Sequence, residues 1–556
     1  MTDSEPNNKA LYLSAFATFF VFLFPLLIEI GFSDFVREGE YNSRIGWSLI
    51  FIFLGLLHKK IWLHAVLLIP FIITGSADIG YAISFGGVFT TATIEAVMQT
   101  DLHEASEYAT SYASPTLILV LFIYWSVSLW LLSKVNLDVS KTRAHTVFLS
   151  LGIVLTLVAG YRITIMQKYY DTIPGIMGSI PSYYRGHMGT KAETDKRQLL
   201  VESISASNTS FELINEQSQT YIFIIGESLS RHHMGIYGYH RDTTPQLSAL
   251  TNELNVFQDV ISSHAQTKAS LSLALTEARG KGDVNYRETL SIVDLANLTG
   301  FKTWWISNQQ PLRTTFSAIA AQASETNFIS NDFQGVEVRR FDEFLTPYIQ
   351  AALNDKAGKK AIFIHTMGSH AQYNNRYPES FNQFTDADVA AYTDQPSARQ
   401  IDAINTYDNS VLYSDHFAAT VLNLLKESPA ELKAFTLISD HGEEVFDKIN
   451  VKGHSPDNVT ANMVDIPFIN WLSVGFKQNR AQTTLAIREN LNKPFMLHDF
   501  YHYAAQLMGI SSPYNDSEKS LISANFKAPE QRKIYRQVYE RDLHYRTTED
   551  QVVDRK

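Results

Sequence analysis

The 556-residue chain contains no cysteine, so disulfide bonds and thiolate metal ligands are both excluded. A nucleophilic side chain must therefore be a hydroxyl rather than a thiol. The chain also has no long run of Lys or Arg, and its formal net charge is -11. Because binding to a phosphate backbone needs clustered positive charge, nucleic acid is not expected as a partner.

Hydrophobic residues are distributed unevenly along the chain. They concentrate between Leu11 and Met166, whereas the remainder has the mixed polarity of a globular protein. We therefore expect a transmembrane domain at residues 1–166, a linker and interfacial segment at 167–209, and a globular domain at 210–556. The predicted transmembrane helices are Leu11 to Phe32, Ile45 to Leu57, Ile61 to Thr74, Leu117 to Leu132 and Thr146 to Ile165.

The lengths of these apolar stretches differ. The first can cross a hydrocarbon layer of roughly 30 Å at about 1.5 Å per residue, and its acidic leader predicts an uncleaved anchor. The second and third fall below the roughly 17-residue minimum for a helical span. They must therefore include flanking residues or form a re-entrant pair.

The charges of the loops predict the orientation. Residues 58–60 and 134–143 are basic, whereas residues 78–114 contain acids and neither Lys nor Arg. By the positive-inside rule the basic loops are cytoplasmic, so five crossings place everything after Met166 outside. Thr100 and Glu104 lie four residues apart in the outer loop and would share one face of an interfacial helix that contacts a lipid. Alternatively, the helices only anchor the globular half.

From Ser210 onward, apolar runs of strand length alternate with helix-like segments, which is typical of an α/β domain with a mostly parallel sheet. Four of these runs pass directly into polar residues: TYIFIIGES, KTWWISNQ, AIFIHTMGSH and AFTLISDHGEE. Ligands of open α/β sheets bind beyond the carboxyl ends of the strands, so we expect these ends to meet at one site. The candidate residues are Glu227, Asn308, Gln309, His365, His370, Asp440 and His441.

Two of these candidates, Asp440 and His441, are adjacent at a strand end, where Gly442 permits a sharp turn. Carboxylate oxygen and imidazole nitrogen are both zinc ligands, and manganese accepts the same set. Thr267 precedes a helix-like stretch, so its hydroxyl is a candidate nucleophile at a helix start, where N–H groups stabilise a phosphoryl anion. The alternative for Thr267 is an ordinary helix N-cap.

Five blocks of the sequence are GESLSRHHMGIYGYHRDTTPQLSAL, VISSHAQTKASLSLAL, HTMGSHAQYNNRYP, NTYDNSVLYSDH and SDHGEEVFDKINVKGHSP. Together they resemble the phosphoethanolamine transferases of Gram-negative bacteria, which belong to the alkaline phosphatase superfamily. The resemblance implies an α-helical transmembrane domain followed by an α/β, alkaline-phosphatase-like periplasmic domain in the bacterial inner membrane. It also implies a metal-dependent transferase that moves phosphoethanolamine from phosphatidylethanolamine to the lipopolysaccharide core or another envelope glycan.

The resemblance further implies roles for the residues that match the family's blocks. The zinc ligands would be Glu227, Thr267, Asp440 and His441, and Thr267 would also be the attacking residue that carries phosphoethanolamine between donor and acceptor. His370 and His454 match histidines that bind the phosphate group or a second zinc, and either one would protonate the leaving groups. The alternative for both is a structural histidine. The substrate-binding candidates are Thr100, Glu104, Asn308 and Gln309.

The chain departs from the lipid A-modifying members of the family, because these carry disulfides around the catalytic threonine. The departure favours the cysteine-poor branches, whose acceptors include core heptose and other envelope glycans. A phosphoglycerol transferase, commonly manganese-dependent, is the alternative enzyme. A membrane-anchored sensor of lipid or glycan is the alternative without catalysis, and it would tolerate loss of Thr267.

Overall fold

The computed structural model describes the chain except residues 1–7, 33–39, 56–60, 90–93, 95–111, 135–142, 167, 169–171, 188–189, 208, 278–288, 310–314, 330–340, 386–395, 457, 536 and 544–556. The chain divides into two compact units, residues 1–188 and 189–556. The predicted linker contributes helix α8 to the first unit and helix α9 to the second. The predicted lipid contacts Thr100 and Glu104 lie outside the described residues.

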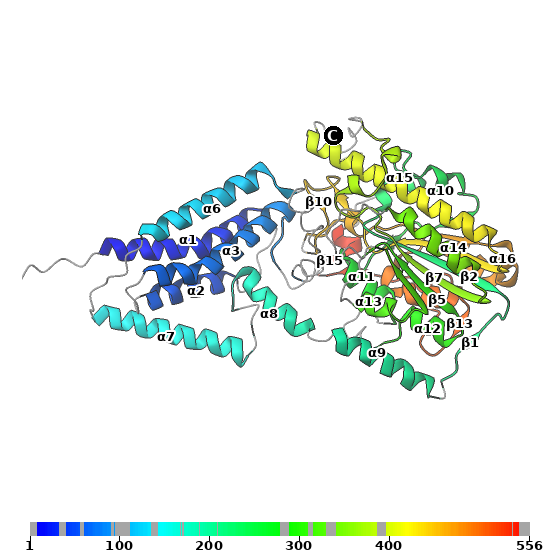
Figure 1. The fold of residues 1–556 in the computed structure, drawn as a ribbon, viewed down its shortest axis with the longest axis horizontal. Helices are drawn as coiled ribbons and strands as arrows, with labels where there is room; N and C mark the ends of the chain where they lie inside the picture. Colours follow the sequence, from blue (N-terminus) through cyan, green and yellow to red (C-terminus); the bar gives the residue numbers. More distant parts are fainter. Residues whose placement is uncertain are drawn as a thin grey trace, which may run out of the picture. The chain divides into compact units, whose positions relative to one another are not determined.

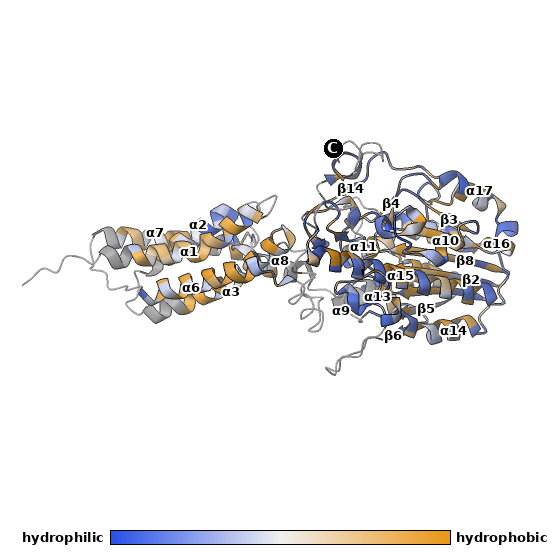
Figure 2. Ribbon diagram, turned by 90° about the horizontal axis from the view of Figure 1, so that it is seen from above, coloured by the Kyte–Doolittle hydropathy of each residue, from blue (hydrophilic) through white to orange (hydrophobic). Residues whose placement is uncertain are grey.

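Apolar helices make up the described part of the first unit (Figures 1 and 2). They are α1 (Asn8–Phe32), α2 (Glu40–Gly55), α3 (Ile61–Phe85), α6 (Pro115–Lys134), α7 (Arg143–Thr164) and α8 (Gly175–His187). Four of them, α1, α3, α6 and α7, are long and apolar enough to cross a membrane. The third predicted stretch continues as a helix to Phe85, so it reaches a spanning length, whereas α2 has 16 residues. The count of five crossings therefore stays a prediction.

A buried arginine links three helices of this unit. Arg44 on α2 contacts Glu40 on the same helix at 2.6 Å, Glu29 on α1 at 2.8 Å and Asp78 on α3 at 2.9 Å. All four side chains are buried, and such charges are tolerated only when they are paired. The first residue of α8, Gly175, donates its N–H to Glu40 at 2.9 Å. Gly175 has φ +55° and lies against Asp78, where a Cβ would overlap the carboxylate. The cluster therefore orders α1, α2, α3 and the start of α8.

The second unit is built on a seven-stranded sheet. Its strands, in spatial order, are β3 (Leu254–Val256), β11 (Phe468–Leu472), β8 (Leu432–Ser439), β2 (Gln219–Gly226), β7 (Lys359–His365), β5 (Lys302–Ser307) and β6 (Glu325–Phe328). The neighbours from β8 to β6 are parallel, and β11 runs antiparallel to both β8 and β3. The predicted mostly parallel α/β fold is confirmed.

Shorter strands form pairs outside this sheet. They are β1 (Glu212–Leu213) with β13 (Ile510–Ser511), β4 (Val260–Ile261) with β12 (Phe495–Met496), β9 (Glu444–Val445) with β10 (Lys452–Gly453), and β14 (Lys533–Ile534) with β15 (Gln537–Val538). The helices are α9 (Thr190–Ser205), α10 (Pro245–Ala249), α11 (Thr267–Ala274), α12 (Ile292–Leu298), α13 (Thr315–Ala320), α14 (Thr346–Asn354), α15 (Ala398–Glu427), α16 (Val474–Asn479), α17 (Ala481–Asn490) and α18 (Phe500–Leu507).

Helices cover both faces of the large sheet, so its central strand β2 is buried along its whole length (Figure 1). Tyr221, Phe223 and Ile225 point to one face and pack in a core with residues of α11, α12, α13 and α18. The alternating residues Ile222 and Ile224 point to the other face, where α10, α14 and α15 pack. Both sides of β2 are thereby occupied, and its carboxyl end is the part that remains for polar side chains.

We predict that Arg44→Met destabilises the first unit strongly, because it leaves three carboxylates buried without their cation. The expected loss is about 3–5 kcal/mol of unfolding free energy. The matched control is Arg162→Met, which removes an arginine that pairs with no carboxylate among the described residues and should cost only about 1 kcal/mol. Thermal unfolding of the purified protein in detergent measures both, and equal losses would contradict the prediction.

Candidate active site

The order of the strands brings the four predicted polar segments to one edge of the sheet. β8, β2, β7 and β5 are consecutive neighbours. Glu227 follows β2, Gln309 lies just beyond β5, and His365 ends β7. Asp440 and His441 follow β8 directly. The expectation that these strand ends meet at one site is confirmed.

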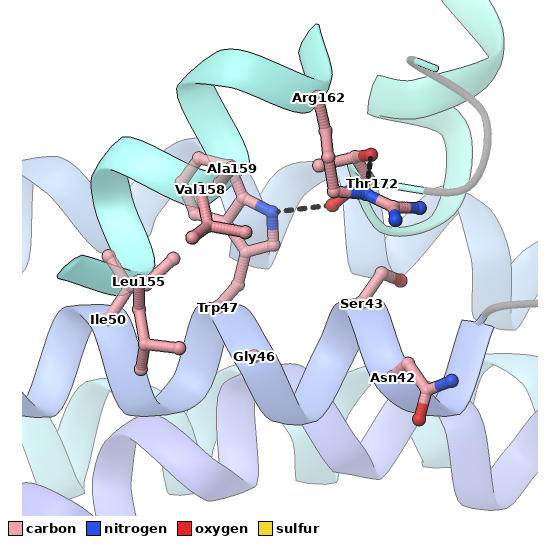
Figure 3. A pocket seen from close by; sticks show the side chains of 10 residues that line it. All are labelled: Asn42, Ser43, Gly46, Trp47, Ile50, Leu155, Val158, Ala159, Arg162 and Thr172. Carbon is pink, nitrogen blue, oxygen red and sulfur yellow. Dashed lines mark hydrogen bonds between the residues drawn. The ribbon is translucent and has the colours of Figure 1, made fainter. Parts of the chain in front are cut away.

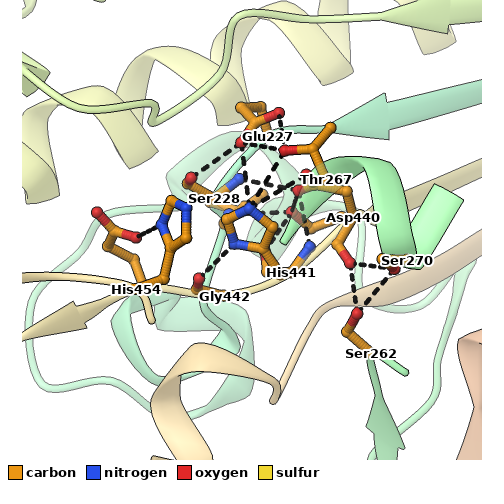
Figure 4. Close-up of polar contacts among 12 residues, drawn as sticks. Glu227, Ser228, Ser262, Thr267, Ser270, Asp440, His441, Gly442 and His454 are labelled. Carbon is orange, nitrogen blue, oxygen red and sulfur yellow. Dashed lines mark hydrogen bonds and ion pairs between the residues drawn. The ribbon is translucent and has the colours of Figure 1, made fainter. Parts of the chain in front are cut away.

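Four side chains converge at this edge (Figure 4). One ligand atom each from Glu227, Asp440 and His441 lies within 4.8 Å of the others. The Thr267 Oγ1 atom lies 3.3 and 3.2 Å from the two carboxylate oxygens of Glu227 and 3.4 Å from Nε2 of His441. The His441 Nε2 atom is also 3.3 Å from Oδ2 of Asp440. The structure thus brings together the four residues predicted as zinc ligands, with the candidate nucleophile among them.

Thr267 is the first residue of α11, and the N-cap is Gln266. The alternative of Thr267 as an ordinary N-cap is therefore wrong. The Thr267 hydroxyl faces Glu227 and His441 from the first turn of α11. A helix start favours a nearby anion, because its free N–H groups carry partial positive charge.

Hydrogen bonds hold Asp440 in one orientation. Its Oδ1 atom accepts N–H bonds from Ser228 at 3.0 Å and from His441 at 2.7 Å. The hydroxyls of Ser262 and Ser270 donate to its backbone carbonyl. Its Oδ2 atom is buried and accepts no hydrogen bond among the described residues. That oxygen is therefore the one directed at the other ligand atoms.

The imidazole of His441 is oriented by its own turn. Its Nδ1 atom lies 2.8 Å from the carbonyl oxygen of Gly442, to which it donates, so Nε2 is the nitrogen that faces Glu227. A Cβ at Gly442 would overlap the carbonyl oxygen of Asn462. Glycine is thus required at this turn because of a close backbone contact.

The turn after β2 is strained. Ser228 has φ 55°, a left-handed conformation that costs a non-glycine residue about 1 kcal/mol or more. The hydroxyl of Tyr407 on α15 donates to the Ser228 carbonyl at 2.7 Å and accepts from the Ser230 N–H at 2.9 Å. Helix α15 therefore holds the turn that presents Glu227.

The two polar residues after β5 have different surroundings. Gln309 donates its amide to Oε2 of Glu227 at 2.8 Å, so it orients that carboxylate. Asn308 is buried and donates to Asp342 at 2.8 Å. Contact with the substrate stays a prediction for both residues.

A second group of ligand atoms adjoins the first. His441, Glu443 and His454 each offer one atom within 4.8 Å of the others, and the rings of His441 and His454 lie 4.1 Å apart (Figure 4). The His454 Nδ1 atom lies 2.7 Å from Glu443, which also accepts the hydroxyl of Tyr373 at 2.7 Å. Burial and the nearby His441 lower the pKa of His454. This favours the neutral imidazole, the form that coordinates a cation.

Two histidines of the HTMGSH block, His365 and His370, lie near Glu227. His370 is close enough to Glu227 for its charge to lower the pKa of that carboxyl. His365 is fully buried, and burial lowers its pKa to about 4, so it is neutral at pH 7. Strand-end reasoning identified His365 as a candidate but gave it no role.

The two buried carboxylates of the site, Glu227 and Asp440, repel each other. Burial and the Glu227 carboxylate raise the pKa of Asp440 to about 7. Burial alone would raise the pKa of Glu227, but His441 outweighs it and holds that pKa well below its ordinary value. Two facing carboxylates, an imidazole nitrogen and a hydroxyl form a donor set that suits a divalent cation. The buried, unsatisfied Oδ2 of Asp440 fits the same interpretation.

The sequence patterns did not predict a buried ionic network that involves His233 and Asp408. His233 contacts Asp408 on α15 at 2.7 Å and Asp447 at 3.2 Å, and Arg241 also binds Asp408 at 2.8 Å. Burial alone would lower the pKa of His233, but the two carboxylates raise it to about 10. The blocks RHHMGIYGYHRD, NTYDNS and SDHGEEVFDKIN contain these residues, yet their pairing depends on the fold. The network ties the segment after Asp440 and His441 to α15.

Two protein families match parts of the chain. The family described as Sulfatase matches residues 219–510, and the family described as Phosphoethanolamine transferase EptA/EptB matches residues 47–174. The chain is 28% identical over 530 residues to phosphoethanolamine transferase EptC of Escherichia coli, covering 92% of this chain and 90% of that protein. It is also 28% identical over 506 residues to phosphoethanolamine transferase CptA of Salmonella typhimurium, covering 85% and 86%.

Solved structures agree with these matches. The periplasmic domain of the E. coli EptC protein, solved in complex with Zn, is 30% identical with a TM-score of 0.57, covering 61% of this chain and 97% of that one. The integral membrane protein lipooligosaccharide phosphoethanolamine transferase A of Neisseria meningitidis has the same fold, with a TM-score of 0.62 at 19% identity, covering 93% and 99%.

The fold and the site define an enzyme of the sulfatase and alkaline phosphatase superfamily, preceded in the chain by an apolar helical unit. Within that superfamily, the chain belongs to the phosphoethanolamine transferase family. The family resemblance in the five sequence blocks is thereby confirmed.

We predict that alkaline pH destabilises the second unit through His233. The folded-state pKa is raised to about 10 from an ordinary 6.5, so this stabilisation is complete below pH 6.5 and is lost as pH rises through 10. Each unit of pKa shift corresponds to roughly 1.4 kcal/mol. Urea unfolding of the purified protein between pH 7 and 10 should show falling stability.

The variant His233→Gln should be less stable at pH 7 and should show a shallower decline with pH. The control is His240→Gln in the same loop, because the His240 side chain is exposed. A pH slope that is unchanged in His233→Gln would contradict the assignment.

Proposed function

We propose that this enzyme transfers phosphoethanolamine from phosphatidylethanolamine to a sugar of the cell envelope, in the lipopolysaccharide core or another envelope glycan. Matches to EptC and CptA along most of the chain support the transferred group. The absence of cysteine supports an acceptor other than lipid A, because it separates this chain from the disulfide-containing lipid A branch.

The observation that carries the proposal is the position of the Thr267 hydroxyl within the candidate ligand group. In the first step, Thr267 Oγ1 attacks the phosphorus of phosphatidylethanolamine, and the bond from phosphorus to the diacylglycerol oxygen breaks. Diacylglycerol leaves with a proton, and phosphoethanolamine remains on Thr267 as a phosphodiester. In the second step, an acceptor hydroxyl attacks the phosphorus, and Thr267 leaves and regains its proton.

Each neighbouring residue has a part in these steps. Glu227 lies within reach of the hydroxyl proton of Thr267. Zinc held by Glu227, Thr267, Asp440 and His441 would supply positive charge that lowers the hydroxyl pKa and offsets the charge of the phosphoryl group. His370 or His454 would donate the proton to each leaving oxygen.

The proposed location is the bacterial inner membrane, with the second unit in the periplasm. Four spanning-length helices support membrane insertion. The basic loops support the orientation, and the matched E. coli domain is periplasmic by description. In this arrangement the site lies on the periplasmic side of the membrane.

We expect the purified protein to contain zinc, and Asp440→Asn or Glu227→Gln to lower its content because each variant removes a carboxylate ligand. Elemental analysis by mass spectrometry measures the metal. The control is Glu431→Gln, since Glu431 is exposed and precedes β8, at the opposite end of that strand from Asp440. Stoichiometric manganese without zinc would support the phosphoglycerol transferase instead.

Thr267→Ala should insert and fold yet lose transfer by at least about 1,000-fold, because removing a covalent nucleophile deletes the intermediate. Ser228→Ala should keep substantial activity, since only one hydroxyl can be in line with the leaving group, and Ser228 lies in the turn after β2 rather than at the start of α11. The assay is turnover of a fluorescent phosphatidylethanolamine, combined with intact-protein mass to detect a phosphoethanolamine adduct. An adduct that persists in Thr267→Ala and disappears in Ser228→Ala would overturn the mechanism.

A further inference from the structure

A groove of about 460 Å³ lies between α2 and α7 in the first unit (Figure 3). Its volume falls in the range of roughly 300–1,000 Å³ that is typical of ligand sites. Asn42, Ser43 and Arg162 line one end, and Ile50 and Leu155 line the other. The groove is therefore amphipathic along its length, with a polar end and an apolar end.

The polar end is held by hydrogen bonds. The Trp47 indole donates to the backbone carbonyl of Thr172 at 2.8 Å, and Nε of Arg162 donates to the Thr172 hydroxyl at 3.1 Å (Figure 3). Thr172 is buried, so these bonds fix both side chains against the segment that follows α7. A preformed wall of this kind reduces the entropy lost on binding.

The charge of Arg162 is not neutralised within the described part of the chain. Its guanidinium is half-buried and forms no ion pair with a described carboxylate, whereas Arg44 in the same unit contacts three. A cation in an apolar helical unit is stabilised by an anionic group. Arginine binds phosphate oxygens particularly well, because its planar guanidinium donates two parallel hydrogen bonds.

We propose that the groove binds one glycerophospholipid, with its phosphodiester at Arg162 and one acyl chain against Ile50 and Leu155. The predicted orientation places the end of α7, and hence the polar end of the groove, at the outer face of the membrane. The ligand is defined by a phosphodiester joined to an acyl chain, which phosphatidylethanolamine and phosphatidylglycerol share. The proposal concerns binding alone and does not depend on the chemistry of Thr267.

Two glycines provide a matched pair of variants. A Cβ at Gly46 would meet no atom within 4 Å, and Gly46 lines the groove, so Gly46→Leu fills it. Gly160 on α7 is equally open but does not line the groove, so Gly160→Leu adds the same side chain elsewhere. Arg162→Gln removes the charge, and Arg162→Lys keeps it while changing the bond to Thr172.

The experiment is native mass spectrometry of the full chain, purified in detergent, stripped of lipid and titrated with each lipid in turn. We expect one bound phosphatidylethanolamine or phosphatidylglycerol, with affinities within about threefold of each other. Diacylglycerol, which lacks phosphate, should bind at least about tenfold more weakly, a difference of roughly 1.4 kcal/mol. Gly46→Leu and Arg162→Gln should weaken phospholipid binding at least about tenfold, whereas Gly160→Leu should retain it and Arg162→Lys, which keeps the charge, should weaken it less than Arg162→Gln does.

Unchanged binding in Gly46→Leu, or equal binding of diacylglycerol, would overturn the proposal. Binding of phosphatidylglycerol alone would also overturn it, because net charge rather than the shared phosphodiester would then be recognised. Thermal unfolding in detergent shows whether each variant is folded, and Arg162→Lys separates the charge from a merely structural bond to Thr172. Because no turnover is measured, failure of this proposal is distinct from failure of the proposed transfer reaction.

Discussion

The second unit is organised around two buried carboxylates that face each other at the ends of neighbouring parallel strands. Glu227 and Asp440 repel each other in a medium of low polarity, so positive charge between them stabilises this arrangement. His441 meets part of this requirement, and the set of donor atoms suits a divalent cation for the rest. A divalent cation held by these groups would also lower the pKa of the Thr267 hydroxyl, which lies beside Glu227 and His441.

The surrounding structure keeps these groups in place despite their repulsion. Tyr407 holds the strained turn at Ser228, and His233 joins the segment after His441 to α15 through two carboxylates. In the first unit, buried charges are likewise paired with opposite charges, since Arg44 is buried with three carboxylates around it. Arg162 differs, because the described residues supply no carboxylate to it, and this contrast identifies the groove beside it as a place for an external anion.

Local patterns in the sequence predicted much of the architecture. Alternation of apolar runs with helical segments identified the parallel sheet, and polar residues after four of the runs identified Glu227, Asp440 and His441. These predictions succeeded because strand ends are local features, and because parallel strands bring such ends to one edge. Thr267 was placed correctly at a helix start. Whether Thr267 or Gln266 is the N-cap depends on a shift of one residue in the helix boundary, which composition does not specify. The extent of α3 was also underestimated, because Gly75 and Ser76 interrupt its apolar run without ending the helix.

The sequence by itself determined the division into an apolar and a globular half, the parallel sheet, and the residue types available for a cysteine-free metal site. Only the tertiary structure decided which atoms meet. Gln309 orients Glu227 across 82 residues of chain, and Asp408 pairs with His233 across 175. The groove between α2 and α7 likewise exists only because two helices distant in the chain pack antiparallel with a glycine between them. Periodicity encodes the face that a residue presents, whereas its partner depends on long-range packing, which no local pattern contains.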